Sequence, residues 1–387
     1  MPLLKVLIAH NRYREPGGED AAVERDRALL ASLGHEVATW YRDNDELARP
    51  AARALAGWRA AYSWPARHAF AARLAEDRPD LVHVHNLVPR LSPSILDACR
   101  EAGVPTVMTL HNYRIACANG LLLRDGRVCE LCLGGNPWHA VRHACYRGSR
   151  PASLAVARMI ARARRTRTWQ TRVDRFVALT QFAKAKLIEA GLPAERVRVR
   201  ANFVDDPGAP DATKPRSGFL FAGRLSVEKG IATLIEAGLR AAIALDVAGD
   251  GPQAGVVFAA ASERIRPLGR LNATEVAAAM GRACALVVPS LYYEGFPLVV
   301  AEAYAAGLPV IASRIGSLAE LVEDGVTGLL ARPGDADDLA ERLRFAEANP
   351  AVMARMGMAA RARYERLYAP APCADRLLAI YAEAIGT

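Results

Sequence analysis

Short apolar runs that alternate with helix-like runs constrain the fold of this chain more than any other feature. In both halves each apolar run has the length of a strand and is followed by a helical pattern or a polar loop. The strands expected in the first half are residues 5–9, 36–41, 81–85, 106–110 and 173–179. The strands expected in the second half are residues 219–222, 244–248, 265–268, 285–288 and 310–312. This alternation predicts parallel, doubly wound α/β sheets, which bind ligands at the carboxyl ends of their strands.

The chain has 387 residues, which is enough for two domains of ordinary size. Residues 207–218 are rich in proline, glycine and polar side chains, so we interpret them as an interdomain linker. The predicted domains are therefore residues 1–206 and 207–369. The two halves repeat the same alternation without any internal sequence repeat.

The composition, 52% hydrophobic and 24% charged, is typical of a soluble globular protein. Lysine and arginine total 50 against 41 acidic residues, and the net charge of +9 permits an anionic partner such as a nucleotide-sugar or a lipid surface. The apolar run 3–9 is short and contains Lys5, so we interpret it as a buried strand rather than a signal peptide. No uncharged apolar run approaches the ~18 residues that span a bilayer. We therefore expect a cytoplasmic protein.

Two carboxylates, Glu294 and Glu302, stand with seven residues between them in a stretch that changes from turn to helix. Gly295 gives the turn backbone freedom, and Pro297 suits the first helical position because the amide proton it lacks would be unpaired there. Glu294 is therefore expected on a loop and Glu302 about one turn into the helix. The unpaired amides at such a helix start favour a phosphate group.

Arg224 and Lys229 lie five residues apart in residues 223–230, across a predicted strand-to-helix turn. Arginine can donate to two phosphate oxygens at once, and lysine supplies a compact positive charge. Both would stabilise a diphosphate whose negative charge grows as its bond to a sugar breaks. An ordinary surface pair is the alternative, but the flanking glycines and the strand-end position disfavour it.

Six short motifs occur together in a characteristic order. They are HVHN at 83–86, TLHN at 109–112, NFVD at 202–205, GRLSVEKG at 223–230, AGDGP at 248–252 and EGFPLVVAE at 294–302. In order and spacing they resemble the retaining GT-B glycosyltransferases of family four (glycosyl transferases group 1), and the resemblance covers nearly the whole chain. It implies the GT-B fold, an α/β architecture in which two Rossmann-like doubly wound domains face each other across a cleft. The first domain would lie on the acceptor side, the second would bind the nucleotide-sugar, and a helix in residues 370–387 would cross back to the first.

The resemblance implies a metal-independent enzyme of the hexosyltransferase type. It would move a sugar from a nucleotide-diphosphate donor to a glycan or lipid-linked acceptor in bacterial cell-surface polysaccharide synthesis. The anomeric configuration would be retained along a front-face path in which the leaving phosphate accepts the proton, so no nucleophile is assigned. The D-x-D sequence at residues 43–45 is given no metal role, and no cofactor is expected for catalysis. Two alternatives stay open: a non-hydrolysing sugar-nucleotide epimerase and a catalytically silent nucleotide-sugar binding protein.

The resemblance also assigns roles to individual residues. The expected catalytic residues are Glu294, His111, Arg224 and Lys229. The expected donor-binding residues are Gly17, Gly18, Arg224, Lys229, Arg270, Leu271, Glu294, Phe296, Pro297, Leu298, Val299 and Glu302. Glu294 and His111 would contact the donor sugar, and Glu302 the ribose. Arg270 and Leu271 would flank the base.

Further candidates lie in the first half of the chain. Gly17 and Gly18 open a helix after the first strand, where the backbone could approach a diphosphate, and a flexible turn is the alternative. His85 and Asn86 are weaker candidates for shaping the acceptor pocket.

Residues 158–175 contain seven arginines and a single acid, Asp174. The residues predicted to share one helical face are Arg158, Arg162, Arg165, Trp169 and Arg172. One interpretation is a solvated face, and the other is docking on an anionic membrane as a peripheral protein. The nearby aromatic residues Trp58, Tyr62 and Trp64 fit either core packing or an acceptor surface. No nucleic-acid partner is expected, because no nucleic-acid motif accompanies the charge.

Four of the seven cysteines fall in one segment, with the spacing C-x11-C-x2-C-x12-C: Cys117, Cys129, Cys132 and Cys145. A C-x2-C pair is a common metal-ligand spacing, so the segment is a candidate for a structural zinc site. His139 or His143 could replace one of the thiolates. The alternative is four cysteines packed as small apolar residues. A disulfide scaffold is not expected in a chain of this size.

Overall fold

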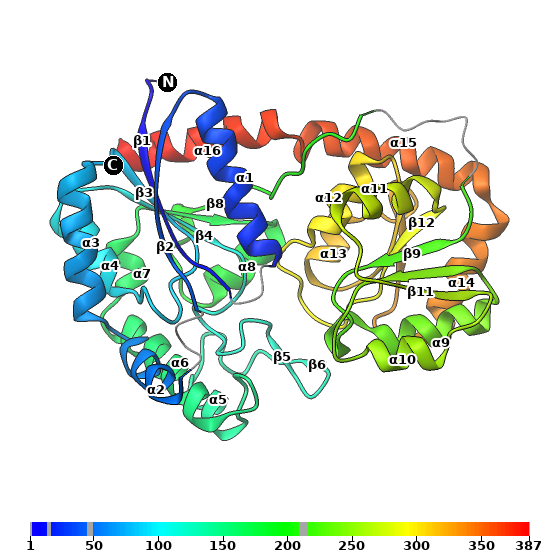
Figure 1. The fold of residues 1–387 in the computed structure, drawn as a ribbon, viewed down its shortest axis with the longest axis horizontal. Helices are drawn as coiled ribbons and strands as arrows, with labels where there is room; N and C mark the ends of the chain where they lie inside the picture. Colours follow the sequence, from blue (N-terminus) through cyan, green and yellow to red (C-terminus); the bar gives the residue numbers. More distant parts are fainter. Residues whose placement is uncertain (1, 14–16, 45–48, 209–215, 387) are drawn as a thin grey trace. The chain divides into compact units, whose positions relative to one another are not determined.

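The computed structural model describes residues 2–13, 17–44, 49–208 and 216–386 (Figure 1). The chain divides into two compact units, and each is described by itself. The first comprises the residues up to Leu122, Cys129–Asn202 and the segment from Cys373 onward. The second comprises Leu123–Val128 and Phe203–Pro372. Within the predicted linker, residues 209–215 lie outside the described residues.

A six-stranded parallel sheet in the order β2-β1-β3-β4-β7-β8 forms the centre of the first unit. Its strands are β1 Lys5–Asn11, β2 Glu36–Arg42, β3 Leu81–Val84, β4 Thr106–Leu110, β7 Arg175–Ala178 and β8 Val197–Val199. Successive strand residues point to opposite faces, and both Val6 and Leu7 on β1 are fully buried. Helices therefore cover both faces of the sheet, as in other parallel sheets.

The helices of the first unit begin at residues suited to capping. Ser63 and Thr180 accept hydrogen bonds from the amides of Ala66 and Ala183, and so satisfy otherwise unpaired groups. The helices are α1 Gly18–Ser32, α2 Pro50–Arg59, α3 Trp64–Asp77, α4 Ser94–Glu101, α5 His139–Arg142, α6 Arg150–Arg165, α7 Thr168–Arg172, α8 Gln181–Glu189 and α16 Pro370–Ile385.

The C-terminal helix α16 completes the core of the first unit. Leu377 and Tyr381 on α16 pack in one buried cluster with Ile8 on β1 and Leu30 on α1. The guanidinium of the fully buried Arg200 donates to the backbone oxygen of Cys373, in the first turn of α16. The last helix is thus tied to the first sheet by both apolar and polar contacts.

A second parallel sheet in the order β11-β10-β9-β12-β13-β14 forms the centre of the second unit. Its strands are β9 Phe219–Ala222, β10 Leu245–Ala248, β11 Ile265–Gly269, β12 Ala285–Val288, β13 Val310–Ser313 and β14 Gly328–Ala331. The chain starts in the middle at β9, goes outward to β11 and then returns to β12 on the other side. The strand order therefore reverses between β9 and β12, where doubly wound sheets bind their ligands.

Helices connect these strands and bury both faces of the second sheet. One face packs Phe219 and Phe221 against α9 and α14, whereas Leu220 is buried on the opposite face. The elements are the 3₁₀ helix η3 Val227–Lys229, then α9 Ile231–Ala241, α10 Ala254–Ala259, α11 Ala273–Arg282, α12 Leu298–Ala305, α13 Gly316–Leu321, α14 Ala336–Ala348 and α15 Pro350–Leu367. All ten strands predicted from the sequence are present.

The structure corrects the prediction of one continuous basic helical face in residues 158–175. α6 ends at Arg165, and Arg167 has a left-handed backbone with φ 50° before α7 begins. Trp169 is buried rather than surface-exposed. The break redirects the residues that helical periodicity had placed on one face. No helix among the described residues is long and apolar enough to cross a bilayer.

Candidate active site

Lys229 and Glu294 meet at the carboxyl edge of the second sheet, although 65 residues separate them in the chain. Lys229 ends the short helix that follows β9, and Glu294 lies in the loop that follows β12. Gly230 has φ 72°, and a Cβ atom there would lie 2.0 Å from the Pro289 oxygen. Only glycine permits this approach, which brings the loop after β9 against the end of β12.

Three side chains donate hydrogen bonds to the buried carboxylate of Glu294. They are the Lys229 ammonium at 2.6 Å, the Ser290 hydroxyl at 2.6 Å and the Tyr292 hydroxyl at 2.7 Å. Burial pushes the pKa of Glu294 upward, but the charge of Lys229 and these hydrogen bonds outweigh it and lower the pKa. Glu294 is therefore an ionised and fully engaged carboxylate near neutral pH.

Ser290 and Tyr292 are site residues that the sequence analysis missed. Both lie in the same short loop as Glu294, four and two residues before it. Nothing in their periodicity distinguishes them from ordinary loop residues. The available signal was their polar character in a stretch that follows a fully buried strand, at the edge where ligands bind.

Arg224 is exposed on the loop that follows β9. The neighbouring loop after β10 packs closely against it, because a Cβ atom on Gly249 would lie 1.8 Å from the Gly223 oxygen. The amide of Leu225 donates to the Asp250 oxygen at 2.9 Å and locks the two loops together. The glycines of both motifs thus let the two loops pack closely, and the Arg224 guanidinium is exposed to solvent beside them.

The remaining predicted donor residues of the second unit fall into two groups. Phe296 and Pro297 are buried immediately before α12, and Leu298 and Val299 form its first turn. Glu302 is half-buried in the second turn of the same helix. All of these residues follow Glu294 closely in the chain.

The predicted base-contacting pair lies elsewhere on the same edge. Arg270 is exposed and Leu271 half-buried, and both follow β11. Strands β10 and β9 stand between β11 and β12, so this pair is set apart from the cluster around Glu294.

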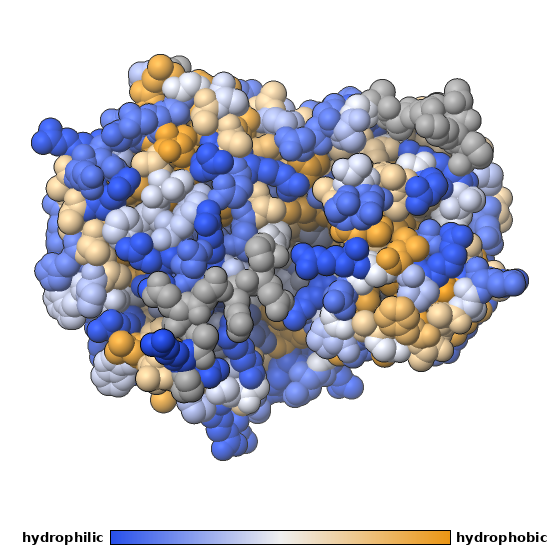
Figure 2. Space-filling view, in the orientation of Figure 1, coloured by the Kyte–Doolittle hydropathy of each residue, from blue (hydrophilic) through white to orange (hydrophobic). Residues whose placement is uncertain are grey.

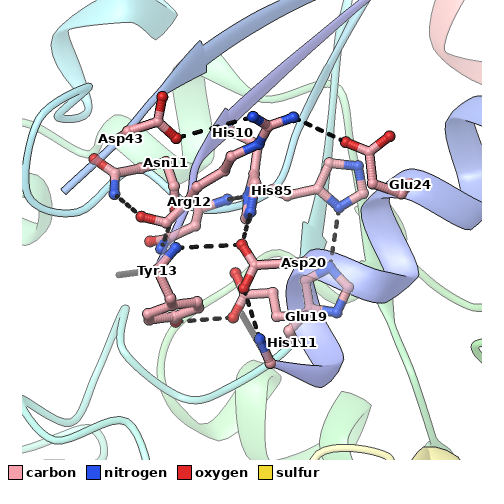
Figure 3. Close-up of polar contacts among 12 residues, drawn as sticks. His10, Asn11, Arg12, Tyr13, Glu19, Asp20, Glu24, Asp43, His85 and His111 are labelled. Atoms are coloured by element: carbon pink, nitrogen blue, oxygen red, sulfur yellow. Dashed lines mark hydrogen bonds and ion pairs between the residues drawn. The ribbon is translucent and has the colours of Figure 1, made fainter. Parts of the chain in front are cut away.

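Three histidines form a chain of contacts in the first unit. Nδ1 of His85 lies 2.9 Å from Nε2 of His111, and their rings stack with centroids 5.3 Å apart (Figure 3). His83, two residues before His85, contacts the Thr109 hydroxyl through Nε2 and the Tyr381 hydroxyl through Nδ1, each at 2.7 Å. Burial lowers the pKa of His83 to about 3 and also lowers those of His85 and His111. The three imidazoles are therefore neutral at physiological pH.

Carboxylates occupy the start of α1, beside the predicted phosphate-binding glycines (Figure 3). Asp20 accepts hydrogen bonds from the Gly17 amide at 2.9 Å and from the Tyr13 amide at 3.2 Å. Glu19 accepts from the Tyr13 hydroxyl at 2.9 Å. Gly17 and Gly18 are exposed, but the Gly17 amide already donates its hydrogen bond to Asp20. Residues 14–16 of this loop lie outside the described residues.

A cavity of about 390 Å³, including its part open to solvent, lies at the carboxyl edge of the first sheet. Its polar lining includes His85, His111 and Arg114, and its apolar lining includes Met159 and Trp169. Within the described part of the chain, His85 Nε2, Arg114 Nε and Trp169 Nε1 are buried without a hydrogen-bond partner. Unsatisfied buried polar atoms are costly, so a polar ligand in this cavity would stabilise them.

A different cluster has the arrangement of a metal site but not its chemistry. Among the residues that the structure describes, only Asp26, His83 and His85 offer three ligand atoms within 4.8 Å of one another. Arg200 donates to both oxygens of Asp26, at 2.6 and 3.0 Å. A guanidinium in this position leaves no room for a cation. The D-x-D candidate is also unsupported, since Asp43 lies 3.9 Å from Arg12 and Asp45 is outside the described residues.

The chain matches two family models that together span most of its length. Residues 27–206 match the model described as "Glycosyltransferase Family 4", and residues 216–349 match "Glycosyl transferases group 1". Among curated proteins, glycogen synthase of Mycobacterium tuberculosis is 39% identical over 181 residues, which is 43% of this chain and 44% of that protein. The chain thus spans under half the length of this relative. Alpha-D-kanosaminyltransferase of Streptomyces kanamyceticus is 25% identical over 73% of this chain and 72% of its own length.

Solved structures show the same fold over the whole chain. HepE of Anabaena, crystallised with UDP, matches with a TM-score of 0.70 at 19% identity and covers 98% of this chain and 99% of its own. The two parallel-sheet α/β units described above, together with this match, show the GT-B fold. Both family models and the structural match agree with the motifs around Lys229 and Glu294. The chain therefore belongs to the GT-B glycosyltransferases.

Proposed function

We propose that this protein transfers a sugar from a nucleoside-diphosphate donor to a hydroxyl of a glycan or lipid-linked acceptor, with retention of configuration and without a metal ion. The observation that carries the proposal is the Lys229–Glu294 pair at the strand-order reversal, with Arg224 exposed in the same loop. The UDP and UDP-glucose complexes of the structurally similar HepE support a nucleotide-sugar donor. The acceptor class that we assign is a precursor of cell-surface polysaccharide.

The charges of the second unit suit a leaving diphosphate. When the C1–O bond breaks, its electron pair moves onto the diphosphate, and Arg224 and Lys229 offset the added negative charge. Donors aimed at developing charge typically contribute on the order of 10²–10³-fold in turnover. Lys229 has three N–H bonds and gives one of them to Glu294, so it can bind phosphate without leaving the carboxylate. This arrangement supports catalysis without a divalent cation.

The state of Glu294 supports a front-face path to retention. A carboxylate that accepts three hydrogen bonds and has a lowered pKa is a poor nucleophile and a poor base. Its role in the proposal is to orient the donor sugar and Lys229. The acceptor oxygen then forms the new bond to C1, and its proton moves to the departing phosphate oxygen. The atoms and charges balance without a covalent enzyme intermediate.

The cavity of the first unit supports binding of a sugar ring. Neutral imidazoles such as His85 and His111 can each donate one hydrogen bond and accept another, as sugar hydroxyls require. The unpartnered atoms of His85, Arg114 and Trp169 offer further positions to a polar ligand. The apolar lining, with Met159 and Trp169, suits the non-polar face of a sugar.

We also propose that the first unit docks on an anionic membrane surface. Trp58 is 66% exposed and Trp64 57% exposed, and Leu55 lies on the same helix as Trp58. The Arg158 guanidinium stacks over Trp58 at 4.1 Å. Figure 2 shows hydrophobic and hydrophilic residues side by side where α2 and α6 lie, at the lower left. Exposed tryptophan beside arginine is typical of helices that lie at a membrane interface.

The test of the transferase proposal is an assay of nucleotide release with a panel of nucleotide-sugars, with and without acceptor extracts. A transferase releases the nucleoside diphosphate in an acceptor-dependent manner and survives EDTA. An epimerase instead converts the donor without acceptor, and a silent binding protein gives thermal stabilisation without release. Proton NMR of the product reports the anomeric configuration. Inversion, or loss of turnover in EDTA with rescue by a divalent metal, would contradict the corresponding part of the proposal.

A further inference from the structure

The segment between β4 and α6 is a long excursion with very little regular structure. Its elements are the two-residue strands β5 Leu123–Arg124 and β6 Arg127–Val128 and the four-residue helix α5. Leu131 and Trp138 in this segment are largely exposed. Leu122, Leu133 and Ala140 are buried, so the segment is anchored at separate points between stretches of irregular backbone. A disulfide or a metal ion is a common way to hold such a segment together.

Three of its four cysteines precede a glycine with a left-handed backbone. Gly120 follows Cys117 with φ 77°, Gly134 follows Cys132 with φ 48°, and Gly148 follows Cys145 with φ 65°. Such a turn directs backbone amides toward the preceding side chain. At Cys117 the amides of residues 119–122 interact with the sulfur and oppose the upward effect of burial on its pKa. The Ala140 amide interacts in the same way with Cys132. Burial outweighs these amides, and the pKa of both thiols is raised.

Backbone contacts link the cysteines near the base of the β5–β6 hairpin. The Cys145 amide donates to the Ala140 oxygen at 3.0 Å, and the Ala140 amide contacts the Cys132 sulfur. The Cys129 amide donates to the Leu122 oxygen at 2.8 Å and closes the hairpin. Burial and the nearby Cys117, Cys145 and Cys129 raise the pKa of Cys132 to about 11. Cys117 and Cys132 are buried, and Cys129 and Cys145 are half-buried. No other cysteines lie in this segment.

The side chains are not drawn together as a bound ion would hold them. The four cysteines are all described, and no three of their sulfurs lie within 4.8 Å of one another. Cys117 instead directs its thiol to Asn119 Oδ1 at 2.9 Å. Sulfur atoms about 2.3 Å from one zinc would stand closer together than this. Metal binding would therefore require the cysteine side chains to turn toward one point.

We infer that Cys117, Cys129, Cys132 and Cys145 bind one structural zinc ion as thiolates. Binding releases the four thiol protons to solvent and leaves a site with a net charge of −2. Arg164 lies beside it and offsets part of that charge, since its guanidinium donates to the backbone oxygens of Cys132, at 2.8 Å, and of Gly135. Four thiolates fill a tetrahedral zinc, so the ion would have no open position for substrate. The ion would tie the ends of the segment together, and it is independent of the transferase proposal.

The test is elemental analysis of full-length protein purified without added metal or chelator. About one zinc per chain is expected, the content of a single four-ligand site. Cys129→Ser combined with Cys132→Ser should abolish zinc binding and make residues 118–148 sensitive to limited proteolysis. Cys284→Ser is the matched control, since this half-buried cysteine lies in the second unit and should leave the zinc content unchanged.

A cobalt measurement keeps the inference falsifiable if the double variant fails to fold. Wild-type protein stripped with a strong chelator and reloaded with Co²⁺ should show thiolate-to-cobalt charge transfer, and each single cysteine-to-serine variant should lose roughly a quarter of it. Folded, protease-resistant protein without metal would overturn the inference. Zinc that survives the double variant would overturn the inference. A disulfide between any of the four cysteines, found by mass spectrometry of unreduced protein, would also overturn it.

Discussion

The Lys229 ammonium lies 2.6 Å from a carboxylate oxygen of the buried Glu294, across 65 residues of chain. The pairing fixes the position of the Lys229 ammonium at the point where the strand order of the second sheet reverses. It also explains why Glu294 stays ionised despite its burial. Both consequences can be tested by changing either partner or the hydroxyls that support them.

Lys229→Ala and Arg224→Ala should each lower turnover by about 10²-fold, because each removes a donor to the leaving diphosphate. Steady-state kinetics with the identified nucleotide-sugar measure the effect. Arg240→Ala is the control, because this arginine makes only exposed ion pairs with Glu236 and Asp337 and should keep full activity. Wild-type turnover in both site variants would refute the diphosphate assignment.

Tyr292→Phe should destabilise the second unit by about 1.5–3 kcal/mol, since it removes a hydrogen bond to a buried charged group. The folded-state pKa of Glu294 lies below its ordinary value of 4.5, so its contribution to stability is present above that pH and is lost as the pH falls through the folded pKa. Losing the hydroxyl raises that pKa. The variant should therefore begin to lose stability at a higher pH than the wild type, as denaturant unfolding between pH 3 and 7 would report. Identical pH profiles would contradict this account.

The buried histidines should make the first unit sensitive to acid. The pKa of His83 is about 3 in the folded state against an ordinary 6.5, so between these values the unfolded chain binds a proton that the folded chain excludes. Stability therefore falls as the pH drops from 6.5 towards 3, by up to about 1.4 kcal/mol per pH unit for each such histidine. His83→Gln can keep hydrogen bonds to Thr109 and Tyr381 without titrating, and should flatten this slope. An unchanged slope would show that His83 is not the cause of the loss of stability in acid.

Asp26→Asn should cost about 3–5 kcal/mol, because it removes the carboxylate charge that offsets the buried Arg200 guanidinium. Thermal unfolding of the two units, followed by calorimetry, should show the first unit melting earlier. The transition of the second unit should stay in place. If only the unfolding temperature of the second unit changed, the Asp26–Arg200 pair would not be what stabilises the first unit.

Trp58→Ala with Leu55→Ser should weaken binding to vesicles that contain phosphatidylglycerol, because it removes the exposed apolar part of the proposed membrane surface. Neutralising Arg165 and Arg167, both exposed, should weaken the same binding by about 1 kcal/mol per charge and reduce its salt dependence. Arg332→Gln, an exposed change in the second unit, is the control. Flotation with phosphatidylcholine vesicles separates charge from apolar insertion. No binding of the wild type to anionic vesicles would end the proposal.

The sequence by itself was sufficient for ten of the twelve strands of the two parallel sheets, for the helical character of α16 and for the strand-end positions of Lys229 and Glu294. These follow from local signals: the apolar periodicity of buried strands, glycines at turns, and a proline before a helix. β14 was missed because its four residues show no periodicity that separates them from a loop. The basic stretch 158–175 was predicted as one face because periodicity does not register a single left-handed residue such as Arg167.

Only the tertiary structure decided which side chains meet. The hydroxyls of Ser290 and Tyr292 on Glu294, the contact of His85 with His111, and the pairing of Arg200 with Asp26 all depend on how sequence-distant or irregular segments pack. Such contacts arise from the burial of whole elements, and the local pattern of residues carries no record of them. The protonation states of Glu294 and the histidines follow from the same packing, because burial and neighbouring charges set them. The sequence therefore determined which groups stand at the strand ends, and the fold determined their partners and their charges.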